Sequence, residues 1–330
     1  MSKRTKSKVT LKLIADAAGT SKFTVSRALA KKSGVSESTR ERIIELADKM
    51  GYRRQTMQSG RTLAVLCEDE DLINGELNQK ILSGIRDEVY RNDLDLIELQ
   101  TSGARRLSDV AERIDALIVI SINRLEVENA AVEMGLPIIK IGTFEPLEQA
   151  DIVRGTNYET GRVVGDLFLK NGHNHLVYVR GRRDFRGRQE RYNGFVTANL
   201  PDEKAKVTDL RWKDGKDLSS KLNRLLSGRK PATAFFCAHD GLAVTIMSEL
   251  LSRNLRIPLD ASVVGYGNYM SSQHVRPLLT TVDVPGAAFG REAVRLAKMR
   301  MDNPGSDQHP IRIQIPSEII YRDTVGKFRD

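Results

Sequence analysis

Residues 11–29, LKLIADAAGTSKFTVSRAL, have the pattern of two short helices joined by a tight turn. Three small alanines in the first half allow close helix packing. Gly19 can take the positive φ that a sharp turn needs, and Ser21 can cap the second helix. Apolar residues then recur at helical spacing, at Val25, Ala28 and Leu29. The pattern predicts a helix-turn-helix, whose second helix enters the DNA major groove. The alternative is an ordinary helical hairpin.

Positive charge is concentrated in the same part of the chain. Residues 1–62 carry 15 Lys and Arg against 5 Asp and Glu, a net charge of +10, whereas the remaining residues carry 37 against 38. This distribution indicates a nucleic-acid-binding head on a neutral body. A solvated basic tail would explain the first nine residues but not the basic residues inside patterned helices, which are Lys22, Arg27, Arg40 and Arg42.

The rest of the composition is that of an ordinary globular protein, and 330 residues are enough for more than one domain. Cys67 and Cys237 lie in apolar runs that we interpret as strands, which favours buried thiols over a disulfide framework. No apolar segment follows the basic N-terminus, and no run approaches the ~18 residues of a membrane helix. We therefore expect a cytoplasmic protein without a membrane partner.

A third helix is expected after Ser36, which can cap it, with an apolar face that ends at Gly51. The order A-D-A-A-G-T-S-K-F-T-V-S-R-A-L at 15–29, V-S-E-S-T-R at 35–40 and G-Y at 51–52 resembles the LacI/GalR family of bacterial transcription regulators. The resemblance implies that the base-reading residues are Lys22, Phe23 and Arg27. These types suit the task, since arginine can bind guanine O6 and N7 together and Phe23 can pack on a thymine methyl. Lys22-Phe23 is closer to the Lys-Met of gluconate-type members than to the Tyr-Gln of the lactose type.

The predicted DNA-contacting set also includes residues around these three and after the third helix, namely Thr10, Ser21, Thr24, Ser26, Arg53, Arg54 and Met57. The segment RRQTMQSGRT departs from the family, which has Pro-Asn and a hinge helix with a leucine wedge at this point. Arg53 and Arg54 can still bind phosphates, and Met57 is the apolar residue available as a wedge. We expect milder operator bending than in members that keep the leucine.

From residue 63 onward, short apolar runs alternate with helical patterns, which predicts parallel doubly wound sheets in two lobes. The expected strands cover 63–67, 94–99, 116–120, 137–142, 176–180, 234–237 and 262–266, and the expected helices cover 78–92, 105–114, 125–134, 160–171, 189–198, 218–226 and 241–253. The resemblance implies a two-lobed body similar to periplasmic sugar-binding proteins. The predicted domains are a helix-turn-helix head at 1–52, a hinge at 53–62 and an effector-binding and dimerisation body at 63–330.

Ligands of such sheets lie beyond the carboxyl ends of the strands, here in the cleft between lobes. Ser121, His239, Asp240 and Asn268 follow expected strands and are candidates. The resemblance adds Arg191 as the residue that grips a ligand hydroxyl or carboxylate, Phe236 as an apolar wall, and Asn78 near an aromatic pair that is missing here. It also places His239 where an asparagine commonly contacts the ligand.

Two departures favour an anionic ligand. The usual Gly-Tyr-Asp is replaced by Gly265-Tyr266-Gly267-Asn268, which removes a carboxylate, and the run 181–191, GRRDFRGRQER, contains five arginines. A sugar acid or sugar phosphate would match this change. The alternative is that most of these arginines form a solvated face. For Arg191, we expect the spacing from Phe195 to direct it away from the packed face and toward ligand.

The sequence offers few motifs for metal binding or catalysis. His173 and His175 share a short loop without a Cys or carboxylate at ligand spacing, so no metal is expected. Phosphate-loop and nucleophile-elbow motifs are absent from the sequence, so we expect neither an enzyme nor a cofactor. The sequence therefore predicts a ligand-responsive repressor of carbohydrate or sugar-acid genes, which binds a near-palindromic operator as a homodimer. The alternatives are a regulator without a small-molecule effector and a cytoplasmic sugar-binding protein.

Overall fold

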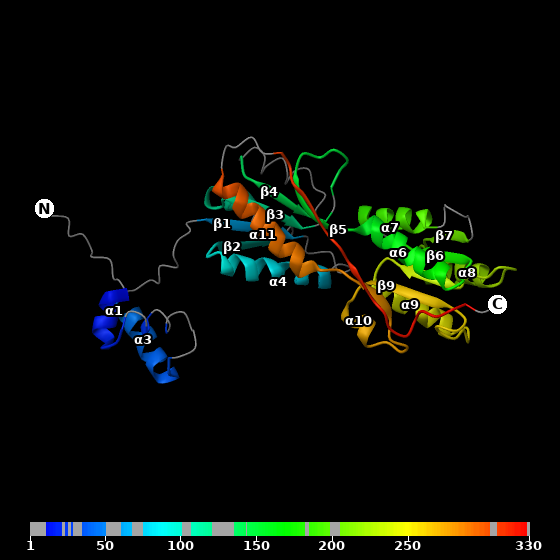
Figure 1. The fold of residues 1–330 in the computed structure, drawn as a ribbon, viewed down its shortest axis with the longest axis horizontal. Helices are drawn as coiled ribbons and strands as arrows, with labels where there is room; N and C mark the ends of the chain where they lie inside the picture. The colour runs from blue at the N-terminus through cyan, green and yellow to red at the C-terminus, as the bar shows by residue number, and fades with distance from the viewer. Residues whose placement is uncertain are drawn as a thin grey trace. The chain divides into compact units, whose positions relative to one another are not determined.

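The computed structural model describes residues 11–21, 24–25, 28, 35–50, 61–67, 75–100, 107–120, 135–142, 144–181, 185–198, 205–303 and 309–328. The chain divides into two compact units, Met1–Gly60 and Arg61–Asp330, which we call the head and the body (Figure 1). Within the described ranges, every helix is too short or too polar to cross a membrane.

The head is built around α1 (Leu11–Ala18) and α3 (Glu37–Lys49). Their apolar faces enclose a small core of buried residues, which are Ile14, Ala15, Ala18, Val25, Ala28, Ile43 and Ala47. Both predicted caps are confirmed, since the Ser21 hydroxyl accepts a hydrogen bond from the Thr24 amide at 3.0 Å and the Ser36 hydroxyl accepts one from the Thr39 amide at 3.3 Å. The chain turns after α1 at Gly19, whose φ is +62°.

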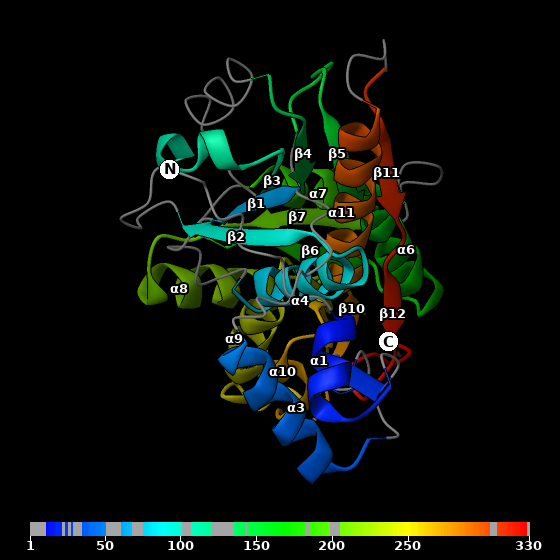
Figure 2. The same ribbon diagram turned by 90° about the vertical axis from the view of Figure 1, so that its left-hand side faces the viewer.

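The first lobe of the body contains a six-stranded parallel sheet in the order β11-β5-β4-β3-β1-β2. Its strands are β1 (Thr62–Cys67), β2 (Asp95–Gln100), β3 (Ala116–Ile120), β4 (Ile138–Ile141), β5 (Asp151–Gly155) and β11 (Arg312–Ile315). Helices α4 (Gly75–Arg91) and α11 (Gly286–Asp302) pack side by side in this lobe (Figure 2). A Cβ on Gly84 would lie 2.0 Å from the Ala287 carbonyl oxygen, so this close helix contact requires glycine.

The second lobe repeats the strand order in the sheet β12-β10-β9-β8-β6-β7, in which β12 alone is antiparallel. Its strands are β6 (His175–Val179), β7 (Lys206–Leu210), β8 (Ala234–Cys237), β9 (Ser262–Gly267), β10 (Thr280–Asp283) and β12 (Glu318–Ile320). Its helices are α6 (Asn157–Lys170), α7 (Arg186–Thr197), α8 (Gly215–Leu226), α9 (Asp240–Leu251) and α10 (Met270–Gln273).

The chain passes between the lobes three times, after β5, after β10 and after β11 (Figure 1). The first two crossings leave from the carboxyl ends of parallel strands. The carboxyl edges of both sheets therefore border the junction between the lobes, which is where ligands of such sheets bind.

The predicted two-lobed α/β body is confirmed, and each expected strand lies within one residue of its observed bounds. The helix expected over 105–114 is wrong. The described part of that stretch forms two 3₁₀ turns, Leu107–Asp109 and Ala111–Arg113, which bury Val110 and Ile114 against the sheet. An apolar spacing of three residues suits a 3₁₀ turn as well as a helix. The helix expected over 125–134 lies outside the described residues.

Candidate effector site and DNA-binding head

Arg191, on α7, lies at the carboxyl edge of the second sheet. The residue is 6% exposed. Its Nη1 donates to the Asn157 side-chain oxygen at 2.6 Å, and its Nη2 donates to the carbonyl oxygen of Ala238, just after β8, at 3.2 Å. The guanidinium carbon lies 3.7 Å from the centroid of the Tyr266 ring at the end of β9. Three elements therefore hold this cation in one orientation.

The charge of Arg191 is only partly compensated. Within the described ranges, no carboxylate forms an ion pair with it, and its buried Nε has no hydrogen-bond partner. Burial opposes the charged form, while the phenols of Tyr266 and Tyr178 raise the pKa of the guanidinium above its usual value. A buried cation surrounded by phenols and amide oxygens is suited to receive an anion.

The expectation that Arg191 points away from the packed face is wrong. Residues four apart on a helix share a face, and both Arg191 and Phe195 are buried on the inner side of α7. The solvated-face interpretation also does not hold for Arg188, which is 3% exposed and donates to the Arg180 carbonyl oxygen at 2.8 Å. Arg186 lies near Glu145 and Glu190. Arg182 and Arg183 lie outside the described residues.

Phe236 and His239, which flank the end of β8, have local structural roles. Phe236 is fully buried, with its ring 5.4 Å from Tyr178 and 5.7 Å from Phe195, so the predicted ligand wall is part of the aromatic core. The Nδ1 atom of His239 accepts a hydrogen bond from the Leu242 amide at 3.3 Å and caps α9.

Asp240 is completely buried at the start of α9. One carboxylate oxygen accepts from the Tyr269 amide at 2.6 Å and the other from the Thr281 hydroxyl at 2.5 Å. Burial raises the pKa of this carboxyl to about 6, although these hydrogen bonds oppose the shift. Asp240 therefore anchors the turn after β9, and its two oxygens are already used within the protein.

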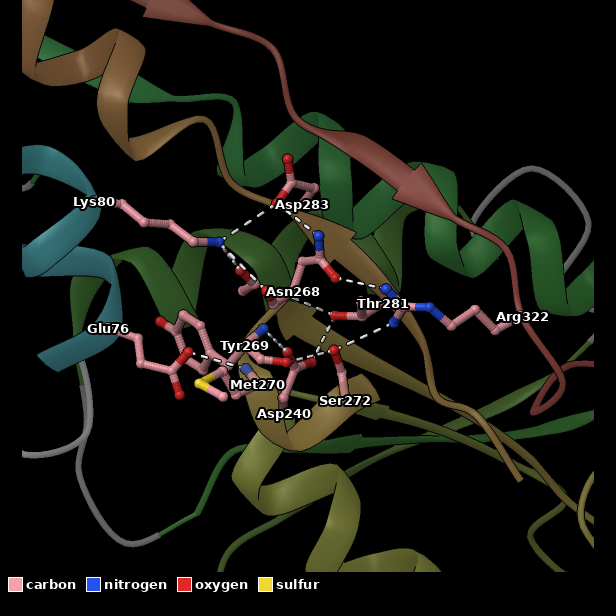
Figure 3. Close-up of polar contacts among 11 residues, drawn as sticks. Glu76, Lys80, Asp240, Asn268, Tyr269, Met270, Ser272, Thr281, Asp283 and Arg322 are labelled. Atoms are coloured by element: carbon pink, nitrogen blue, oxygen red, sulfur yellow. Dashed lines mark hydrogen bonds and ion pairs between the residues drawn. The ribbon is translucent and has the colours of Figure 1, made fainter. Parts of the chain in front are cut away.

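Asn268 lies in that turn and is bound on both sides of its amide (Figure 3). Its Nδ2 donates to Asp283 at 3.1 Å, and its Oδ1 accepts from Arg322 at 2.7 Å. The preceding Gly267 has a φ of +124°, and a Cβ there would lie 2.5 Å from the Tyr269 ring. The ring of Tyr269 therefore fills the space beside the position where the family pattern has an aspartate.

The remaining effector candidates are less informative. Asn78 is buried on α4 in the first lobe, and Ser121 lies outside the described residues. Sequence reasoning missed Asn157 and Tyr266 as neighbours of Arg191. Asn157 follows β5, a strand that the sequence did not predict. Tyr266 belongs to the run Gly265-Tyr266-Gly267-Asn268, but that run was used only to note the missing aspartate after the tyrosine.

In the head, the structure describes only Ser21 and Thr24 of the predicted DNA-contacting residues, and these two form the helix cap given above. Thr10, Lys22, Phe23, Ser26, Arg27, Arg53, Arg54 and Met57 lie outside the described residues. Arg40 donates to the carbonyl oxygens of Ala28 and Val35, and Arg42 donates to that of Ala18. These two arginines on α3 therefore brace neighbouring segments of the head.

The two histidines considered for a metal site are bound within the second lobe. The ring nitrogens of His173 contact the hydroxyls of Thr233 and Ser262, each at 3.0 Å. Those of His175 contact the Lys230 carbonyl oxygen at 3.0 Å and the Thr208 hydroxyl at 3.1 Å. The described part of the chain contains no group of three or more His, Cys, Asp or Glu residues arranged to hold a metal ion.

Comparison with known families assigns both units. Residues 10–55 match the model of bacterial regulatory proteins of the lacI family, and residues 166–325 match that of the periplasmic binding protein-like domain. The chain belongs to the lacI family. It is therefore a DNA-binding transcription regulator and not an enzyme.

Curated relatives and solved structures agree with this assignment. The HTH-type transcriptional repressor PurR of Vibrio vulnificus is 26% identical over 339 residues, covering 96% of this chain and 99% of the relative. The probable HTH-type transcriptional repressor ExuR of Bacillus subtilis is 25% identical over 293 residues, covering 84% and 87%. The complex of transcriptional regulator CelR with cellobiose superposes with a TM-score of 0.67 at 22% identity, covering 96% and 99%. A ribose-bound regulator from Enterococcus faecium gives 0.67 at 22%, covering 82% and 100%.

Proposed function

We propose that this regulator is a repressor that binds a near-palindromic operator as a homodimer and responds to an anionic small molecule bound at Arg191. The repressor assignment is supported by the names of its relatives PurR and ExuR. The observation that carries the anionic effector is the buried guanidinium of Arg191, which has an unpaired Nε and no ion-pair partner among the described residues.

Electrostatics favours a ligand with a carboxylate or phosphate. Burying a cation without a full counter-charge costs several kcal/mol, and an oxyanion bound to a guanidinium forms short, charge-assisted hydrogen bonds. A sugar acid or sugar phosphate would supply both the charge and hydroxyl groups for the neighbouring Asn157 and Tyr266. The solved relatives named above hold neutral sugars, so the proposed effector differs from theirs in charge.

The proposed response follows from the architecture. An effector between the lobes favours one relative position of the two sheets, because it contacts groups at a carboxyl edge that borders the junction. In a two-fold dimer, such a shift changes the spacing of the two heads, and operator binding depends on that spacing.

A thermal-shift screen of the full chain tests the effector. The panel contains ribose, cellobiose, gluconate, glucuronate and glucose 6-phosphate. We expect the melting temperature to rise with an anionic member only, since saturation at 100 Kd adds about 2.7 kcal/mol. Arg191→Met should abolish the rise. Arg253→Met should retain it, because Arg253 lies just after α9 and pairs with Glu249 of that helix. A rise with a neutral sugar that persists in Arg191→Met would refute the anionic site.

Selection from a random duplex-DNA library tests the repressor proposal and also finds the operator sequence. We expect an enriched site with two inverted half-sites, bound by a dimer. Arg27→Ala should cost about 1–3 kcal/mol of binding free energy and relax sequence preference at one position of each half-site. Lys298→Ala, on α11 of the body, is the matched control. Enrichment of a single, asymmetric half-site would argue against the dimer.

A further inference from the structure

The N-terminal part of α4, in the first lobe, contacts the turn that follows β9 in the second lobe (Figure 3). The Lys80 ammonium donates to the Gly267 carbonyl oxygen at 3.0 Å and to the Asn268 carbonyl oxygen at 3.3 Å. It also lies 3.6 Å from a carboxylate oxygen of Asp283. One turn earlier on α4, Glu76 accepts a hydrogen bond from the Met270 amide at 3.0 Å.

The two surfaces are complementary in order as well as in charge. Glu76 and Lys80 are four residues apart, so they project from one face of α4. The turn presents two carbonyl oxygens to Lys80 and an amide to Glu76. Exchanging the two side chains would place a carboxylate against carbonyl oxygens and an ammonium against an amide. The contact therefore depends on the order of the two side chains along α4, which matches the order of acceptors and donor in the turn.

The turn has an unusual backbone that directs its carbonyl groups toward the lysine. Gly267 and Asn268 both have positive φ values, +124° and +49°. Only glycine fits at 267, because of the Tyr269 ring, and asparagine is one of the few other residues found in the left-handed region. Two successive carbonyl oxygens can then reach one ammonium. The Lys80 Nζ also lies 5.8 Å from the centroid of the Tyr269 ring.

The turn is held firmly within its own lobe. Asp240 binds the Tyr269 amide, and Arg322 donates to the side-chain oxygen of Asn268 and to the Ser272 hydroxyl. Ser272 in turn donates to the Tyr269 carbonyl oxygen at 2.6 Å. Because these bonds fix the turn, a bond to it from α4 restrains the whole second lobe and not merely a loop.

We propose that Glu76 and Lys80, together with residues 267–270, form a latch that holds the two lobes together in the effector-free protein. All of its groups belong to this chain, so the latch closes without a ligand. A second set of contacts between the lobes, from Arg154 to Glu190 and from Arg186 to Glu145, joins α7 to the β4–β5 side of the first lobe. Because no ligand atom takes part in the latch, the proposal does not depend on which effector the regulator binds.

Hydrogen exchange of the full chain, without added ligand, tests the latch. Lys80→Met keeps the aliphatic stem but removes the donor. We expect exchange in peptides covering 267–273 and 75–82 to accelerate about tenfold, since a net hydrogen bond contributes up to ~1.5 kcal/mol. Glu76→Gln should accelerate the same two peptides less, because the amide oxygen can still accept.

Two controls keep the test decisive. Lys298→Met removes an ion pair with Asp302 that lies within α11, so both peptides should exchange as in the wild type. Peptides covering β8, in the core of the second lobe, should stay protected in every variant, which shows that the variants are folded. Unchanged exchange in both latch peptides of Lys80→Met would overturn the proposal, and so would a change confined to 75–82.

Discussion

Two corners of the second sheet each bury one charged side chain, but they differ in how its polar atoms are satisfied. At the corner beside the turn that follows β9, both oxygens of Asp240, the first residue of α9, accept hydrogen bonds from within the lobe. At the corner beside the end of β8, Arg191 of α7 has an unpaired Nε, and none of the described carboxylates pairs with it. The first corner is complete without a ligand and the second is not. A buried charged group therefore indicates a binding site only where some of its hydrogen-bonding atoms have no partner within the protein.

The largest effect is expected at the complete corner. Asp240→Ala leaves the Tyr269 amide and the Thr281 hydroxyl without their acceptor, so the free energy of unfolding should fall by about 3 kcal/mol. Urea denaturation at neutral pH measures it. Asp240→Asn, which keeps an acceptor oxygen, should lose less. A loss in Asp240→Ala no larger than in a surface variant such as Thr245→Ala would refute the anchoring role.

A smaller effect is expected from the protonation of the same carboxyl. Its pKa is raised from 3.8 to about 6 in the folded protein, so between these values the folded state holds a proton that the unfolded state releases. The contribution of Asp240 to stability therefore falls by roughly 2 kcal/mol as the pH rises from 4 to 7.

The comparison of wild type with Asp240→Asn across this pH range isolates that contribution. His173 acts in the opposite direction, because burial lowers its pKa to about 4, but its effect is common to both proteins and cancels. We expect the stability of the variant relative to wild type to increase with pH. A difference that stays constant from pH 4 to 7 would show that Asp240 ionises normally.

The smallest effect on stability is expected at the incomplete corner. Arg191→Met removes a cation that is costly to bury, together with two hydrogen bonds, and these effects oppose each other. Without effector, the free energy of unfolding should change by less than ~1 kcal/mol, as measured by the same denaturation. A loss as large as that of Asp240→Ala would indicate that Arg191 is a structural residue like its neighbour.

The sequence predicted β3, whose apolar residues run without interruption, but it missed β5, a buried strand that carries two charges. β3, with the sequence ALIVI, was predicted at its observed bounds. β5, with the sequence DIVRG, was missed although it is fully buried. Its Asp151 binds Arg300 on α11, and its Arg154 binds Glu190 on α7. These partners are distant in sequence, so no local pattern shows that the two charges can be buried.

The candidate site was predictable in its location and less so in its roles. The rule that ligands lie beyond the carboxyl ends of strands selected residues that do lie at that edge, such as His239, Asp240 and Asn268. It did not reveal that Asp240 and Asn268 are bound within the lobe, because those bonds come from residues 269, 281, 283 and 322. The burial of Arg191 was within reach of the sequence, since its spacing from Phe195 places both on one face.

The three crossings between the lobes have a consequence for how the protein is made. The first sheet needs β11, and the second needs β12, and both strands follow all the others in sequence order. While the chain is being synthesised, β5 and β10 present open edges until those residues leave the ribosome. Exposed edges of this kind invite pairing with other nascent chains. Premature termination before residue 312 would therefore damage both lobes at once, and the fragment would be prone to aggregate.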